Sequence, residues 1–175
     1  MSKTAAAVLA FAVLTLFAIP MSAQLIPSGN LYAGGSYGQL TNVTIKQSYR
    51  GFNGSAEFIP FARFSHFGFV LDGSGFFRRG NSGYSVTQYN LLAGPRLSTN
   101  LGKWRPFIHA MGGIKHVNSA GNIYNPIVID VGGGADYKIF FKNFSWRVQG
   151  DFMRSRYLSA NQYDYRASTG IVWRF

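Results

Sequence analysis

The final segment of the chain alternates between apolar and polar side chains, and this alternation restricts the fold more than any other feature. One parity carries Ile171, Trp173 and Phe175, whereas the other carries Arg166 and Arg174. Successive side chains of a β-strand point to opposite faces, so a period of two separates these sets. The segment therefore predicts a β-strand with one apolar face and one charged face.

The same pattern recurs along the chain between clusters of Gly, Asn, Ser and Pro, which are typical of turns. We place eight strands at residues 30–39, 47–58, 64–77, 84–98, 105–117, 127–139, 144–157 and 164–175. The connections near residues 60, 102 and 142 are short, and those at 41–46, 80–83, 118–125 and 159–164 are more polar. Brief connections between consecutive strands indicate an antiparallel, up-and-down arrangement, with the polar loops on the outer side.

The composition is unusual for a protein that folds in water. Aromatic residues make up 17% of the chain and charged residues 13%, about half of the usual charged fraction. After residue 24 no stretch approaches the roughly 18 apolar residues that a membrane-spanning helix needs. Only helices and closed β-barrels span a bilayer. We therefore predict an all-β fold, an eight-stranded antiparallel transmembrane β-barrel over residues 24–175.

The N-terminus has the features of a cleaved secretory signal. Lys3 supplies the positive charge, residues 5–19 are apolar, and Met21, Ser22 and Ala23 precede the expected cleavage site. We expect residues 1–23 to be a helical signal peptide and the mature protein to leave the cytoplasm.

Charged residues gather on the strand face opposite the apolar one. The expected interior polar network comprises Glu57, His66, Asp72, Arg96, Asp130, Asp136, Arg147, Asp151, Arg166 and Arg174. An eight-stranded barrel is just wide enough for side chains to fill it, which predicts a plugged interior. The alternative is a soluble barrel or sandwich with these residues on its solvated face. A narrow barrel would then have to hold most of the aromatic side chains inside.

Aromatic residues lie near the predicted strand ends and suggest two interfacial girdles. The expected periplasmic girdle comprises Phe61, Phe64, Trp104, Phe107, Phe140, Phe141, Trp146 and Trp173. The expected outer girdle comprises Tyr49, Phe76, Phe77, Tyr84, Tyr124, Tyr157 and Tyr163.

The ending ASTGIVWRF resembles the C-terminal signature of outer-membrane β-barrels, in which a terminal aromatic residue follows apolar residues at every second position. With QYNLLAGPRLS and GGGADYK in inner strands, the chain is similar to the small barrels of the OmpA/OmpX type in Gram-negative outer membranes. The resemblance implies that Ile171, Trp173 and Phe175 are the residues that the barrel-assembly machinery recognises. It does not extend to a peptidoglycan-binding domain, because the chain stops at the last strand.

The chain is strongly basic, with a formal net charge of +11 at pH 7. Such an excess suits nucleic acid, anionic lipid or lipopolysaccharide, and the secretion signal argues against nucleic acid. Arg78, Arg79, Arg154 and Arg156 lie near the expected outer rim, where guanidinium groups would contact lipopolysaccharide phosphates.

No catalytic or metal-binding motif is present. His66, His109 and His116 have no nucleophile motif around them, and three scattered His without Cys show no ligand spacing. We expect no enzyme activity, no cofactor and no metal. Three functions remain open: a monomeric, envelope-supporting barrel in contact with outer-membrane lipid, a narrow passive channel for small solutes, and a soluble periplasmic barrel that binds an apolar ligand. The first is the one we expect.

Overall fold

The computed structural model describes residues 28–41, 46–60, 66–79, 85–119, 122–139, 141–157 and 160–175. The expected signal peptide at residues 1–23 lies outside this part. Among the described residues, no helix has the length and hydropathy that crossing a membrane requires.

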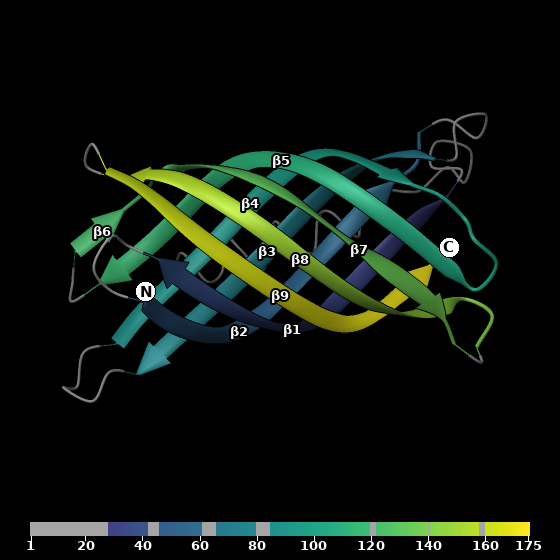
Figure 1. The fold of residues 1–175 in the computed structure, drawn as a ribbon, viewed down its shortest axis with the longest axis horizontal. Coiled ribbons are helices and arrows are strands. Elements are labelled where there is room, and N and C mark those ends of the chain that lie inside the picture. The colour runs from purple at the N-terminus through teal and green to yellow at the C-terminus, as the bar shows by residue number, and fades with distance from the viewer. Residues whose placement is uncertain are drawn as a thin grey trace, which may run out of the picture.

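The described residues form a closed antiparallel barrel (Figure 1). The strands are β1 Gly29–Thr41, β2 Lys46–Phe58, β3 Phe67–Arg79, β4 Ser85–Ser98, β5 Trp104–Ser119, β6 Asn122–Tyr124, β7 Ile127–Lys138, β8 Phe144–Tyr157 and β9 Ala160–Arg174. Their order is β4-β3-β2-β1-β9-β8-β7-β5-β6, and β4 also pairs with β5. The short β6 pairs only with β5, so eight strands make the ring and the predicted up-and-down barrel is confirmed.

The β2–β3, β4–β5 and β7–β8 connections lie at one end of the barrel, and the β1–β2, β3–β4, β5–β7 and β8–β9 connections lie at the other. The C-terminus lies at the same end of the barrel as the β4–β5 turn, at the right of Figure 1. In that turn Leu101 and Trp104 exchange backbone hydrogen bonds, and Gly102 adopts a positive φ of 64°, which glycine tolerates. We call this the turn end, and the opposite end the hairpin end.

At the hairpin end the strands extend further than the sequence suggests. The sequence predicts a loop at residues 118–125, but β5 continues to Ser119 and Val117 pairs with Tyr124 of β6. The segment is rich in turn-forming residues, which favour the prediction of a loop. In the structure its two arms pair with each other as a local hairpin. Pro126 then separates β6 from β7, because proline has no N–H for the ladder. Likewise β9 begins at Ala160 rather than at Asp164.

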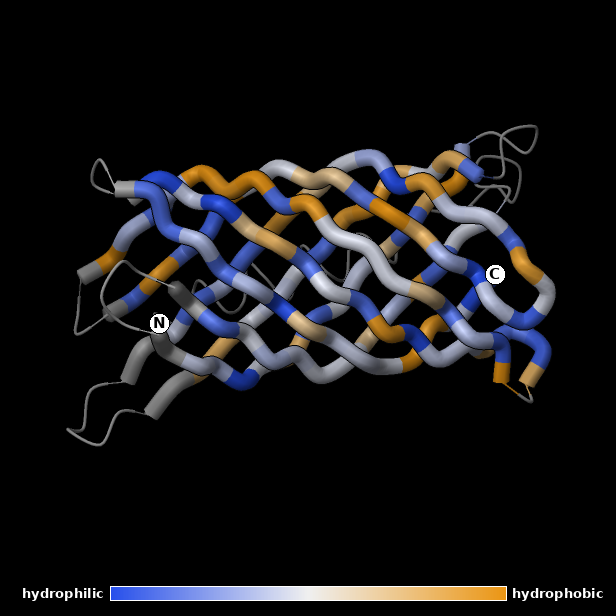
Figure 2. The backbone as a smooth tube through the Cα atoms, in the orientation of Figure 1, coloured by the Kyte–Doolittle hydropathy of each residue, from blue (hydrophilic) through white to orange (hydrophobic). Residues whose placement is uncertain are grey.

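The two faces of the barrel wall follow the predicted alternation. On β9, Arg166 and Val172 are buried, whereas Ile171 and Trp173 are exposed on the outer surface. Figure 2 shows hydrophobic and hydrophilic residues alternating along most strands. The barrel therefore reverses the arrangement of a water-soluble protein, because charged side chains lie inside and many large apolar side chains lie outside.

Outward aromatic side chains do form groups towards both ends. Trp104 packs on Tyr137 at the turn end, and Phe77 packs on Tyr89 towards the hairpin end. Three predicted girdle residues are wrong, since Tyr49, Phe76 and Phe107 point inward and are buried. Their parity places them on the inner face, where their rings fill the lumen. Phe61, Phe64, Tyr84 and Phe140, and the side chain of Tyr157, lie outside the described part of the chain.

Candidate functional site in the barrel interior and at its ends

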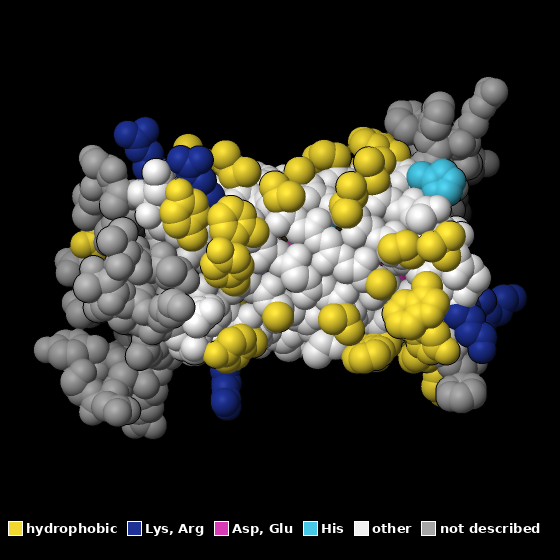
Figure 3. Space-filling model, viewed as in Figure 1, with side chains coloured by type: hydrophobic (Ala, Val, Ile, Leu, Met, Phe, Trp, Pro, Cys, Tyr) yellow, Lys and Arg dark blue, Asp and Glu magenta, His cyan; other side chains and the backbone are white. Residues whose placement is uncertain are grey.

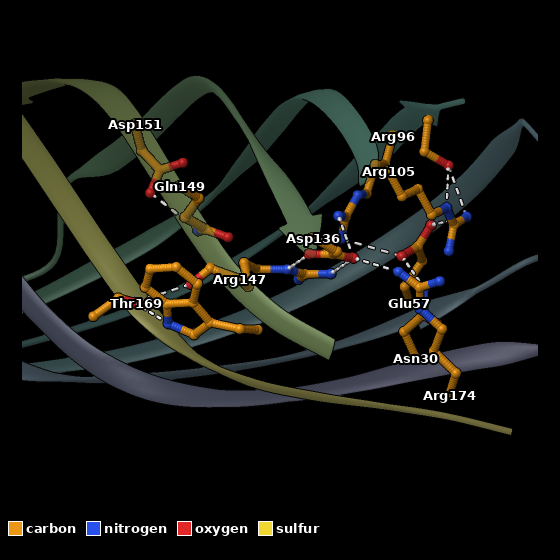
Figure 4. A network of polar contacts seen from close by, with 12 residues as sticks. Asn30, Glu57, Arg96, Arg105, Asp136, Arg147, Gln149, Asp151, Thr169 and Arg174 are labelled. Atoms are coloured by element: carbon orange, nitrogen blue, oxygen red, sulfur yellow. Dashed lines mark hydrogen bonds and ion pairs between the residues drawn. The ribbon is translucent and has the colours of Figure 1, made fainter. Parts of the chain in front are cut away.

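An arginine-rich cluster fills the turn-end half of the lumen (Figure 4). Its members are Glu57, Arg96, Arg105, Asp136, Arg147 and Arg174. Arg147 donates to both carboxylate oxygens of Asp136, at 2.6 and 3.0 Å, and Arg174 reaches Asp136 at 3.3 Å. Arg96 pairs with Glu57 at 3.1 Å. Four guanidinium groups thus share two buried carboxylates.

Aromatic rings lie against this excess of positive charge. The guanidinium carbon of Arg96 lies 3.5 Å from the ring centroid of Phe107, and that of Arg147 lies 4.8 Å from the same centroid. Arg147 also lies 4.9 Å from the ring centroid of Tyr32. Cation–π contacts of this kind are worth about 2 kcal/mol or more when desolvated, so these inward rings help to hold arginines of like charge together.

An acid-rich cluster lies further towards the hairpin end. It comprises Asp72, His109, Asp130, Asp151 and Arg166, all of them buried. Arg166 donates to Asp151 at 2.6 Å and to Asp72 at 2.7 Å. His109 Nε2 faces Asp151 at 2.9 Å and Asp130 at 3.3 Å. Here three carboxylates share one guanidinium.

Strand register brings these charges together. Asp136 on β7 is directly opposite Arg147 on β8, and Asp151 on β8 is opposite Arg166 on β9. Opposite charges at such cross-strand positions attract each other and favour one register. The alternation in the sequence therefore produces the ion pairs as soon as the strands pair.

An apolar layer borders the acid-rich cluster. It is formed by Val70, Leu92, Met111, Val128 and Met153, which pack together inside the barrel. Met111, Val128 and Met153 lie on the hairpin side of His109, Asp130 and Asp151 on the same strands. Beyond it Lys115 pairs with Asp164. The cavity here measures about 10 Å³, room for about one water, and is lined by residues including Tyr49, Phe76, Gln88, Met153 and Asp164.

Most predicted interior residues lie where the sequence places them. Glu57, Asp72, Arg96, Asp130, Asp136, Arg147, Asp151 and Arg166 are buried and belong to one of the two clusters. Arg174 also contacts Asp136, but 29% of its side chain remains exposed near the end of β9.

The prediction for His66 is wrong. It precedes β3, is exposed, and lies with Nδ1 2.9 Å from the Ser98 carbonyl oxygen, away from both clusters. His109 takes the interior place instead. Its parity on β5, shared with Phe107 and Met111, would have revealed it, but the weak alternation of that segment obscured the signal.

The other predicted positions lie at the two ends. Ile171, Trp173 and Phe175 are exposed on the outer surface at the turn end. Phe175 and Gly29 also exchange backbone hydrogen bonds of 3.1 Å, which join β9 to β1. At the hairpin end Arg154 and Arg156 are exposed on β8. The backbone of Arg78 and Arg79 ends β3 there, and their side chains lie outside the described part.

No family model matches the chain, and no curated protein matches it by sequence. Several solved structures match its fold. Neisserial surface protein A has a TM-score of 0.70 at 12% identity, covering 84% of this chain and 97% of that one. The N-terminal β-barrel domain of OprF from Pseudomonas aeruginosa has a TM-score of 0.57 at 14% identity, covering 85% and 97%. Ail from Yersinia pestis, in complex with the heparin analogue sucrose octasulfate, has a TM-score of 0.55 at 14% identity, covering 85% and 98%. The chain has the fold of the small eight-stranded outer-membrane β-barrels.

Proposed function

We propose that this protein is an integral outer-membrane barrel that supports the cell envelope, with a plugged interior and a basic rim that contacts lipopolysaccharide. The observation that carries the proposal is the reversed polarity of the barrel wall. Ile127 is 73% exposed and Ile108 is 62% exposed, whereas Asp130 and Asp136 are fully buried. Figure 3 shows hydrophobic side chains over the outer wall and Lys or Arg towards the ends. An outer wall that carries so many exposed apolar side chains suits lipid rather than water.

The interior argues against the two other functions. A soluble carrier of an apolar ligand needs an apolar cavity of about 300–1,000 Å³, and the cavity near the hairpin end is about 10 Å³. A passive channel needs an open path, whereas the apolar layer and both charged clusters occupy the lumen. The filled interior therefore favours a barrel whose role lies in its outer surface and its rims.

Fractionation and gel migration test membrane residence directly. We expect the protein in the detergent-extracted outer-membrane fraction, with an electrophoretic mobility that changes on boiling because the closed barrel resists detergent until heated. Recovery in the soluble periplasm without a mobility shift would refute the proposal.

A second experiment tests the assembly signal with Phe175→Ala, which removes the terminal ring but keeps the β1–β9 backbone hydrogen bonds. If the terminal residues are an assembly signal, this variant accumulates less folded barrel in cells yet refolds normally in detergent.

The basic rim is tested by lipid retention. We expect Arg154→Gln with Arg156→Gln to lower co-purification of lipopolysaccharide about tenfold, because charge-assisted hydrogen bonds to phosphate are lost. Adding Arg78→Gln and Arg79→Gln extends the test to the end of β3. The matched control is Lys103→Gln with Lys138→Gln, which removes two exposed cations from the turn end. Equal retention in the rim variants and the control would remove the lipopolysaccharide part of the proposal. That Ail is solved with a sulfated sugar is a precedent for polyanion contact on this fold.

A further inference from the structure

Three side chains of the acid-rich cluster converge inside the barrel. His109 comes from β5, Asp130 from β7 and Asp151 from β8, and all three are buried. His109 Nε2, one oxygen of Asp130 and one oxygen of Asp151 lie within 4.8 Å of one another. A nitrogen and two carboxylate oxygens at this spacing form a potential ligand set.

A glycine allows this convergence. Gly132 on β7 is paired with His109 on one side and with Asp151 on the other, so the three form one row across three strands. A Cβ at position 132 would collide with Asp151 Oδ1 and His109 Nε2. Because Gly132 leaves that space free, His109 and Asp151 meet across it.

Asp130 is the least satisfied group of the cluster. It is fully buried, and among the described residues neither of its carboxylate oxygens accepts a hydrogen bond of good geometry. Its nearest cationic groups are His109 Nε2 at 3.3 Å and Arg166 at 3.9 Å. Nε2 of His109 carries at most one proton, which serves one of the two carboxylates that it faces. A buried carboxylate that is incompletely paired is costly, so a cation between the three groups would stabilise them.

The charges point the same way. Among the described residues, Arg166 is the one guanidinium that pairs with Asp72, Asp130 and Asp151, which leaves a formal charge of −2 when His109 is neutral. The surplus arginines lie in the arginine-rich cluster. On β5, the buried ring of Phe107 is the inner-face residue next to His109, on the side of that cluster. A divalent cation among the three ligands neutralises the local charge.

We propose that His109, Asp130 and Asp151 bind a divalent transition-metal ion, with Zn²⁺ as the fitting probe. A tetrahedral site with bonds of about 2.0–2.1 Å separates its ligand atoms by about 3.3 Å. The Nε2–oxygen distances are 2.9 Å to Asp151 and 3.3 Å to Asp130. Imidazole nitrogen with carboxylate oxygen suits zinc and its first-row neighbours. Arg166 donates to the other oxygen of Asp151, which orients Oδ1 towards the ion.

Metal entry has to accompany folding. The apolar layer containing Met111, Val128 and Met153 lies on the hairpin side of the site, and the arginine-rich cluster lies on the turn side. The ion therefore acts as a structural cross-link between β5, β7 and β8. This proposal concerns the barrel interior and does not depend on which membrane holds the barrel.

The test uses untagged protein, unfolded in urea and refolded in detergent with either Zn²⁺ or a chelator. After desalting, we expect about one zinc per folded chain by elemental analysis, and a higher urea midpoint than for the chelated protein. Refolding with Co²⁺ should give the intense visible absorption of a tetrahedral site. Asp130→Asn and His109→Gln should each reduce retained zinc at least tenfold. Asp130→Asn should fold well in chelator, because it removes one excess negative charge.

Two controls separate ligation from charge and from surface binding. Asp72→Asn removes the same charge from the same cluster but no proposed ligand, and His116→Gln removes a histidine outside the cluster, so both should retain the ion. Wild-type protein without retained zinc or a cobalt spectrum would overturn the proposal. So would equal retention in the wild type, Asp130→Asn and His109→Gln, which would locate the ion elsewhere. If either ligand variant does not fold, the other variant and the cobalt spectrum of the wild type decide.

Discussion

Replacing Asp136 by Asn is expected to destabilise the barrel by about 3–5 kcal/mol, which should lower the urea midpoint of the refolded protein in detergent. Asp136 is fully buried and contacts Arg147, Arg174 and Arg96. Without its charge, four guanidinium groups would depend on Glu57 alone. The urea midpoint of refolded protein, followed by gel mobility and tryptophan fluorescence, measures the loss.

The matched control is Asp72→Asn, the same chemical change in the acid-rich cluster. Its cost should be smaller, because Arg166 keeps Asp151 at 2.6 Å and three carboxylates there share one guanidinium. The double variant Asp136→Asn with Arg147→Gln should recover about 1–3 kcal/mol of the loss, since the stranded guanidinium is removed as well. Equal costs for Asp136→Asn and Asp72→Asn would contradict the uneven division of charge between the clusters.

The fold follows from local patterning, and most of the site follows from parity. Alternation in each segment assigned Asp136 and Arg147 to the inner face, and adjacent strands then made them partners. Parity cannot specify partners two strands apart. The approach of His109 to Asp151 depends on the barrel register and on the missing side chain of Gly132, neither of which a single segment contains.

The errors have two causes. Aromatic residue type near strand ends predicts an outer girdle position for Phe76, Phe107 and Tyr49, although their parity indicates the interior, where they lie. The prediction for His66 depends on a strand that starts at residue 64, whereas β3 begins at Phe67. Where residue type and parity disagreed, parity predicted the face correctly, provided that the strand had the right ends.

The reversed polarity raises the question of how a barrel with a charged interior stays specific. Replacing a buried ion pair by apolar residues is often neutral or stabilising, so the pairs need not add stability. They do select a register, because a shift by one residue would move Asp151 and Arg166 from the lumen to the outer wall. In a bilayer that shift would expose charge to lipid, so the outer environment and the inner pairs favour the same register.

The outer environment can be measured with a second substitution, Leu91→Arg. Leu91 lies on the outer face, in the middle of β4, and is 52% exposed. Its cross-strand neighbours are Gly73 and Ile114. In a bilayer an outward arginine near the midplane costs about 2–4 kcal/mol, whereas on a water-exposed wall a surface substitution costs within about 0.5 kcal/mol.

Leu97→Arg is the matched control for this substitution, because it has the same residue type, the same strand and nearly the same exposure, 51%, but lies next to the end of β4 at Ser98. Near the membrane interface the cost falls to about 0–1 kcal/mol. Refolding into lipid vesicles and comparing urea unfolding of both variants with the wild type gives the difference. A large cost for Leu91→Arg with a small one for Leu97→Arg places the centre of the wall in lipid. Small and equal costs would mean that water covers the wall, and the envelope function would fail with it.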